Sequence, residues 1–147
     1  MKSVSSTWFE CIVTYDKMLD NGTTKRAVES YVVDALTFTE AESVIIEQMK
    51  VYVVGEFVIK NINPCQFKEV CFSEKDGEDR WFKVKVAFIS FDENTGRERL
   101  SNVNYLVQAD TAEFAIKNMN EVMGGTLNEY RIVANVETKI VDVFKYE

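Results

Sequence analysis

The sequence predicts an α+β fold made by tandem duplication of a β-β-α-β unit, with an antiparallel-dominated sheet or sheets of six to eight strands and two helices. Three observations lead to this prediction. Trp8-Phe9 returns as Trp81-Phe82, 73 residues later in the chain. Apolar residues alternate with polar ones over several strand-length segments. Two helix-start signals each follow such a segment.

The repeat rests on landmarks that occur in the same order in both halves of the chain, at offsets of 72 to 74 residues. These landmarks are Trp8-Phe9 with Trp81-Phe82, Gly22 with Gly96, Tyr31, Val33 and Ala35 with Tyr105, Val107 and Ala109, residues 56–59 with residues 129–132, and Phe72 with Phe144. We therefore place the first repeat at residues 1–72, an acidic linker at 73–79 and the second repeat at 80–147, and expect one compact pseudo-symmetric domain. Identity between the halves is low, so convergence of two similar units is the alternative interpretation.

The first repeat begins with a predicted hairpin. Residues alternate from Trp8 onward, and the second arm covers residues 24–35. The expected inward-facing side chains are Phe9, Cys11, Val13 and Tyr15 on the first arm and Tyr31, Val33 and Ala35 on the second. Asn21-Gly22 predicts the turn, because these residues tolerate the positive φ values that a tight hairpin turn requires.

A helix start follows the hairpin. Thr37 and Glu40 have the spacing of a capping box, in which the two side chains satisfy backbone N–H groups at the start of a helix. The helical stripe that follows is Ala41, Val44, Ile45, Gln48 and Met49. We expect a strand at residues 56–62, a break near Pro64, which cannot donate a backbone hydrogen bond, and a continued or restarted strand at residues 66–72.

The second repeat follows the same plan. Its expected elements are a first strand with Phe82, Val84, Val86 and Phe88 facing inward, a turn region at 92–99 and a second strand at 102–109. Asp110 and Glu113 predict the second helix start, with Asp110 as the capping residue. Gly124-Gly125 predicts its end, because glycine adopts the left-handed cap conformation without strain. The β-branched segment 129–146 holds the last strand or pair of strands.

The composition is typical of a globular acidic protein. Apolar residues make up 46% of the chain and charged residues 28%, which argues against disorder. No apolar run approaches the ~20 residues that a membrane helix needs, and the N-terminal segment lacks the apolar region of a signal peptide. Three cysteines do not make a disulfide framework, so we expect a reducing, cytoplasmic location.

The residues of the common catalytic classes are missing or not organised. The chain has no histidine, which excludes a Ser-His-Asp triad, a Cys-His pair and every histidine-bearing zinc site. Cys11, Cys65 and Cys71 form no C-x-x-C pair, and the acidic linker lacks the spacing of an EF-hand loop. Neither glycine-rich phosphate-binding motif occurs. We predict a protein that is not an enzyme, with no cofactor and no metal; chemistry based on carboxylates or lysine is the alternative.

The sheet face opposite the predicted core carries more apolar residues than a solvated face should. The candidate binding residues on or beside this face are Trp8, Ile12, Val32, Arg80, Trp81, Lys83, Lys85 and Leu106. We expect the face to meet the other repeat, a second copy, a protein partner or a ligand. Basic residues around Trp81 also resemble a base-stacking strand with phosphate contacts, but the net charge of −7 argues against nucleic acid.

Five segments carry a resemblance to a known family: WFECIVTYDK, YVVDALTFTEAE, GEFVIKNI, RWFKVKVAFI and YLVQA. Together they resemble a domain-of-unknown-function family that is common in Bacteroides-type bacteria and in their phages and mobile elements. The resemblance extends from Trp8 to Tyr146. It implies a bacterial or phage origin and a cytosolic location, and it implies no activity and no site residues.

The leading functional interpretation is a non-enzymatic binding or interaction protein of bacterial or phage origin, with a protein partner or a homodimer at the apolar face. The first alternative is a small-ligand or nucleotide-binding protein with a site between the repeats, because clefts between units are common ligand sites. The second is a nucleic-acid-binding protein. No membrane association is expected.

Overall fold

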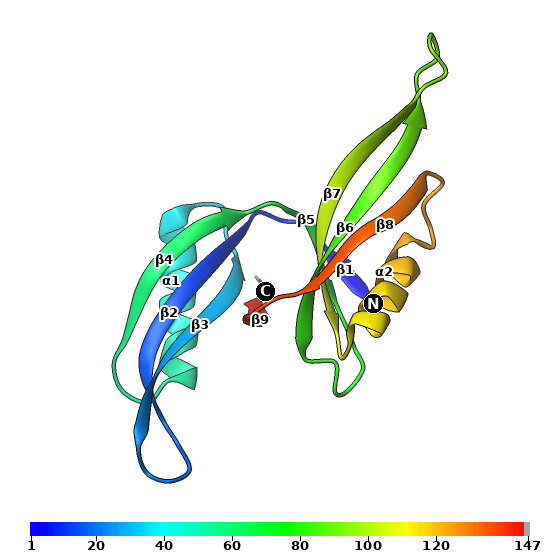
Figure 1. Ribbon diagram of the computed structural model, residues 1–147. Coiled ribbons are helices and arrows are strands. Elements are labelled where there is room, and N and C mark those ends of the chain that lie inside the picture. The colour runs from blue at the N-terminus through cyan, green and yellow to red at the C-terminus, as the bar shows by residue number, and fades with distance from the viewer. Residues whose placement is uncertain (146–147) are drawn as a thin grey trace. The chain divides into compact units, whose positions relative to one another are not determined.

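The structure is a computed structural model that describes residues 1–145, which form nine strands and two helices in two mixed sheets (Figure 1). In chain order the elements are β1 Lys2–Val4, β2 Trp8–Met18, β3 Thr24–Asp34, α1 Phe38–Tyr52, β4 Phe57–Cys65, β5 Phe67–Phe72, β6 Arg80–Phe91, β7 Glu98–Ala109, α2 Ala112–Met123, β8 Glu129–Glu137 and β9 Ile140–Phe144. The last two positions of the predicted second repeat, 146 and 147, lie outside the described residues. The α+β class and the two helices are as predicted from the sequence.

The chain divides into two compact units, each with one sheet and one helix. The α1 unit consists of residues 6–65 and the segment from Lys139 onward. The α2 unit consists of residues 1–5 and 66–138. The units therefore differ from the two contiguous halves that the sequence predicts as repeats. The repeat boundaries themselves stay a prediction.

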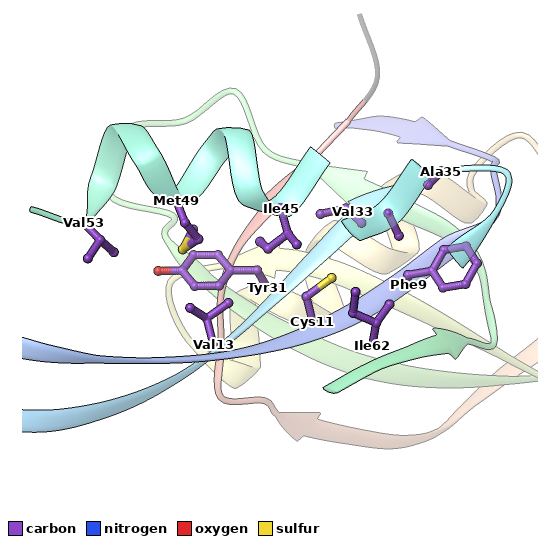
Figure 2. Close-up of a cluster of buried hydrophobic side chains, with 11 residues drawn as sticks. Phe9, Cys11, Val13, Tyr31, Val33, Ala35, Ile45, Met49, Val53 and Ile62 are labelled. Atoms are coloured by element: carbon purple, nitrogen blue, oxygen red, sulfur yellow. The ribbon is translucent and has the colours of Figure 1, made fainter. Parts of the chain in front are cut away.

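The sheet of the α1 unit has the strand order β4-β2-β3-β9. β2 pairs antiparallel with β3 and with β4, and β9 pairs parallel with β3. One face of this sheet packs against α1, and the buried side chains there are Phe9, Cys11, Val13, Tyr31, Val33, Ala35, Ala41, Ile45, Met49, Val53 and Ile62 (Figure 2). The inward-facing residues predicted from the alternation belong to this core, with Tyr15 partly buried against it.

Helix α1 begins where the capping box predicts. The Thr37 hydroxyl accepts a hydrogen bond from the backbone N–H of Glu40 at 3.1 Å. Ala41, Ile45 and Met49 are spaced by four residues, so they lie on one side of the helix, and all three are buried against the sheet. The sequence therefore determines both where this helix starts and which side of it faces the sheet.

The sheet of the α2 unit has the strand order β1-β5-β7-β6-β8. β5 pairs parallel with β7, and the remaining pairs are antiparallel. Its core against α2 consists of Cys71, Phe82, Val84, Val86, Tyr105, Val107, Ala109, Ala115, Met119 and Met123. The predicted inward face of the first strand is thus the core face of β6, with Phe88 partly buried against it.

The cap of α2 corrects one prediction. Thr111, not Asp110, is the capping residue, and its hydroxyl accepts from the N–H of Phe114 at 3.2 Å. Thr111 lies 74 residues after Thr37, so the offset of the repeat indicated the right residue. Asp110 precedes the cap, one position too early for its side chain to reach the third N–H of the helix.

The strand count is also higher than the predicted six to eight. Within residues 1–145, the last strand of each half is broken into two, which gives eight, and β1 is the ninth. β1 lies before the first predicted strand and pairs with β5 through Lys2↔Phe72 and Val4↔Val70. A break near Pro64 is as predicted, but Pro64 itself still belongs to β4, which runs to Cys65. β4 is an edge strand, where a missing N–H is tolerated.

Consecutive strands at both breaks belong to different sheets. β4 ends at Cys65 and β5 begins at Phe67, yet β4 is in the α1 unit and β5 lies beside β7 in the α2 unit. β8 and β9 are divided in the same way, with β9 beside β3 in the α1 unit. Each half of the chain therefore contributes its last strand to the sheet of the other half. We call this arrangement the strand exchange.

Candidate interaction surfaces

The structure places the predicted binding residues in both units, and half of them are buried. Trp8, Ile12 and Val32 lie on the α1-unit sheet, and the other five lie on β6 and β7. Trp8 and Trp81 are each 1% exposed, and Val32 and Leu106 are fully buried. Arg80 and Lys83 are exposed, whereas Ile12 and Lys85 are half-buried. The exposed residues of this predicted set, Arg80 and Lys83, are charged and therefore form no apolar surface.

Trp81 is buried and contacts residues of its own unit. Its ring meets Phe72 edge-on, with the ring centroids 5.5 Å apart. Its backbone carbonyl accepts from both the N–H and the hydroxyl of Thr138 at 2.8 Å. Arg80 forms an exposed ion pair with Glu137 at 3.4 Å. The indole is 1% exposed in this conformation, whereas stacking on a base requires an accessible ring face.

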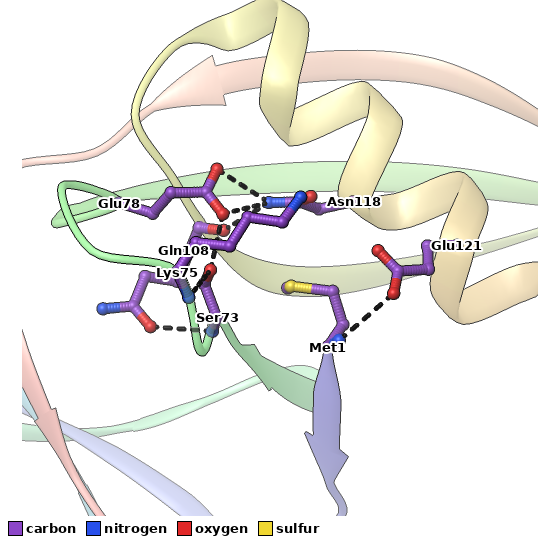
Figure 3. Close-up of polar contacts among 7 residues, drawn as sticks. All are labelled: Met1, Ser73, Lys75, Glu78, Gln108, Asn118 and Glu121. Atoms are coloured by element: carbon purple, nitrogen blue, oxygen red, sulfur yellow. Dashed lines mark hydrogen bonds and ion pairs between the residues drawn. The ribbon is translucent and has the colours of Figure 1, made fainter.

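A buried polar cluster lies between the acidic linker and α2 (Figure 3). Its members are Ser73, Glu78, Gln108 and Asn118, which we call the Glu78 cluster. The Asn118 amide donates to the Glu78 carboxylate at 3.2 Å and to the Gln108 carbonyl at 3.0 Å. The Ser73 hydroxyl donates to Glu78 as well. These bonds attach the linker to the helix and to β7.

Glu78 differs from the solvated linker residue that the sequence suggests, since it is only 6% exposed. Burial by itself would raise the pKa of this carboxyl. Hydrogen bonds from Ser73 and Asn118, the charge of Lys75 and the Asp110 N–H favour the ionised form, and together they lower the pKa below its usual value. The signal that could have located this cluster is Asn118 itself, an amide on the apolar stripe of α2 that requires a buried partner.

Glu78→Gln is expected to lower the free energy of unfolding by about 1–3 kcal/mol at neutral pH, because the amide cannot accept as many hydrogen bonds as the carboxylate. The pKa of Glu78 is lower in the folded than in the unfolded protein. Its stabilising contribution is therefore present above the unfolded pKa and is lost as the pH falls through the folded pKa. The difference between wild type and variant should shrink over that acid range.

Urea unfolding at a series of pH values measures this difference. Glu74→Gln is the matched control, because Glu74 lies exposed in the same linker and its replacement should change stability by no more than about 0.5 kcal/mol. A Glu78→Gln effect that does not change with pH would contradict the assignment of the lowered pKa to Glu78.

The β6–β7 hairpin ends in an arm that extends beyond α2 and β8 (Figure 1). The pairing of β8 with β6 stops at Ile89↔Glu129, and we define the α2-unit arm as residues 89–100. Leu100 lies opposite Ile89 and Phe91 lies opposite Glu98, so the three apolar side chains share one face of the arm. Phe91 is 61% exposed and Leu100 is 53% exposed. Phe91 therefore gives this face an exposed aromatic side chain.

The β2–β3 hairpin ends in a second arm, the α1-unit arm, residues 14–28. Met18 and Val28 are exposed there. Lys17 and Lys25 lie directly opposite each other. A shallow groove of about 350 Å³ is lined by Lys17, Leu19, Lys25, Arg26, Ala27, Val28 and Glu29. Asp16 forms an ion pair with Arg26 at 3.4 Å, so this arm carries mixed charge rather than a basic surface.

The three cysteines form no disulfide, and their thiols are expected to be unreactive. Burial, with a smaller contribution from Glu10, raises the pKa of Cys11 and of Cys65 to about 12, and burial with Glu69 does the same for Cys71. At neutral pH these groups are thiols, which are poor nucleophiles and poor metal ligands. Among residues 1–145, no three acidic or cysteine side chains are grouped so as to hold a metal ion.

Neither α1 nor α2, the helices of the described part of the chain, is long and apolar enough to cross a membrane.

Comparison with known proteins identifies a family but no function. A family model described as a domain of unknown function (DUF4494) matches residues 7–146, which is nearly the whole chain. No curated protein and no solved structure matches the chain.

Proposed function

We propose that this chain, which belongs to the family described as a domain of unknown function (DUF4494), binds another protein and is not an enzyme. The chain acts in the cytoplasm of a bacterium or in a phage-infected cell. Its α2-unit arm carries the contact surface. A small ligand bound between the repeats stays a prediction.

The observation that supports this proposal is the apolar face of the α2-unit arm. A two-stranded hairpin is marginally stable in water by itself, and exposing Phe91 and Leu100 on it costs free energy unless another surface covers them. Aromatic side chains are enriched at protein interfaces. Glu98, opposite Phe91 on the same face, forms an ion pair with Arg131 at 2.6 Å, and this pair would be part of the polar rim of the interface.

The proposal includes a tandem duplication. β2 and β6 occupy the same place in their sheets, as do β3 and β7, β4 and β8, and β9 and β5. The arms then occupy equivalent positions, with turns at Gly22 and Gly96, both of which have positive φ. Under duplication, the α1-unit arm would be the counterpart of the binding arm, with Met18 in place of Phe91 and Arg26 in place of Leu100.

Capture from a lysate of the organism that carries the gene, with the immobilised full chain as bait, tests this role. Phe91→Ser with Leu100→Ser should abolish retention of a specific protein, because it removes the apolar contact while leaving the buried core intact. Met18→Ser with Val28→Ser on the α1-unit arm is the matched control and should retain the same protein. Thermal unfolding of both variants should match that of wild type.

Two results would count against this role. Retention by the Phe91/Leu100 variant equal to that of wild type would show that the α2-unit arm is not the contact surface. Equal loss in both double variants would show that capture reflects general surface hydrophobicity.

A further inference from the structure

The outer edge of β7 is open over the first half of the strand. β7 begins at Glu98, and its pairing with β5 begins only at Asn104. Within residues 1–145, no strand therefore lies beside residues 98–103 on the side away from β6. Figure 1 shows β7 along the side of the α2-unit arm that faces away from β8. A strand placed in line with β5 would extend the sheet along this free edge.

The direction of the backbone groups on the free edge follows from the turn of the hairpin. The Asp92 N–H donates to the Arg97 carbonyl at 2.8 Å, which makes these two residues a hydrogen-bonded pair. In an antiparallel ladder such pairs alternate with pairs whose backbone groups point away from each other. Along the continuous register from this pair, the N–H and C=O groups that point outward belong to Glu98, Leu100 and Asn102. An extended peptide presents the complementary groups to such an edge.

The free edge of β7 lacks the features that normally prevent strand addition. Natural edge strands are kept short, charged, bulged or interrupted by proline. In the same sheet, β1 has three residues, and the pairing of β8 with β6 contains a register shift. Residues 100–103 of β7, Leu-Ser-Asn-Val, carry no charge, and they pair with β6 without a register shift. This edge is therefore the one in the sheet best suited to accept a strand.

A polar groove of about 350 Å³ lies where β5 stops and the free edge begins. It is lined by Gln66, Phe67, Lys68, Asn102, Val103 and Asn104. Lys68 is the one charged side chain among these six. Its ammonium lies 5.6 Å from the centroid of the Phe88 ring, and Phe88 is opposite Ser101. The positive charge therefore reaches back along the free part of β7, on the face opposite to that of Leu100.

We propose that the free edge of β7 accepts an extended segment of a partner protein in which apolar and acidic side chains alternate. On one face the apolar side chains of this segment lie beside Leu100 and continue the apolar face of the α2-unit arm. On the other face its carboxylates lie beside Lys68. The alternation is required because successive side chains of a strand point to opposite faces. This mode of binding rests on the proposed role of the arm in protein binding, and it specifies the chemistry of the partner's contact segment.

Fluorescence anisotropy with a labelled short peptide of alternating valine and glutamate tests this edge. Asn102→Pro should weaken binding by about tenfold or more, because it removes an outward N–H and places the proline ring on the edge, while the bonds to β6 are kept. Val28→Pro is the matched control and should bind the peptide as wild type does. Val28 is the corresponding outward residue on the free part of β3, where the neighbouring charges of Lys25 and Arg26 protect the edge.

Two further peptides test the pairing and the charge preference on wild-type protein. The valine–glutamate peptide methylated at every backbone nitrogen should not bind, because it has no N–H to donate. A valine–lysine peptide should bind more weakly than the valine–glutamate peptide, and Lys68→Gln should reduce that difference. These measurements do not depend on the folding of a proline variant.

Four results would overturn strand addition at β7: no binding of the valine–glutamate peptide to wild type, equal binding to Asn102→Pro, equal binding of the methylated peptide, or loss of binding in Val28→Pro alone. Lysate capture separates this failure from failure of the proposed function. A partner that is retained by Asn102→Pro but lost from the Phe91/Leu100 double variant would leave the protein-binding role intact and show that the partner does not pair with β7.

Discussion

Replacement of Phe82 by alanine is expected to lower the free energy of unfolding by about 3–5 kcal/mol. Phe82 is 1% exposed and lies on β6, an interior strand of the α2-unit sheet, in the core between the sheet and α2. Its removal deletes buried apolar area and leaves a cavity that the fixed backbone of β6, paired on both sides, cannot close. We therefore expect a large loss of stability at this position.

Urea unfolding followed by circular dichroism measures this loss. Phe91→Ala is the matched control, because it deletes the same side chain from the exposed end of the same strand and should change stability by no more than about 0.5 kcal/mol. Similar losses for both variants would mean that β6 does not direct Phe82 into a packed core.

The faces and helices were predictable because their signals are local. Alternation in residues 8–15 identifies the core face of β2 without knowledge of its neighbours, and the same holds for β6. Thr37 identifies the start of α1 because a cap depends on residues only three positions apart. The cap of α2 was misplaced by one residue, although the offset of the repeat points to Thr111.

The strand exchange was not predictable because strand pairing is not local. β5 and β9 are short strands, and their residue patterns do not specify a partner strand. Only the break at Pro64 and the length of the segment 129–146 indicate that the last strand of each half is divided. The choice of sheet depends on contacts with residues far away in the chain.

Less of the candidate surface than of the fold was predictable from the sequence. Alternation shows that Trp8 and Trp81 lie on the face away from the helices, but it gives no information on what covers that face. The hairpin turns were predictable from Gly22 and Gly96, whereas the exposure of Phe91 depends on where β8 stops pairing. Glu78 was missed because its partner Asn118 is 40 residues away.

Cleavage of the chain within the acidic linker is expected to leave the two fragments bound to each other. A protease site inserted after Asp76 would divide the chain between β5 and β6, at exposed residues. The N-terminal fragment then contributes β1 and β5 to the sheet of the α2 unit, and the C-terminal fragment contributes β9 to the sheet of the α1 unit. The cleaved protein should elute as an equimolar complex under native conditions.

Urea should separate the fragments at a lower midpoint than it unfolds the uncleaved protein with the same insertion, because folding has become bimolecular and depends on concentration. Phe144→Ala should lower that midpoint further, since it removes the ring that stacks on Tyr31 from the strand that holds the C-terminal fragment. Fragments that separate without denaturant would mean that chain connectivity, and not the pairing of β5 and β9, keeps these strands in place. Their persistence as a complex would show that each sheet is completed by contacts strong enough to act between separate chains.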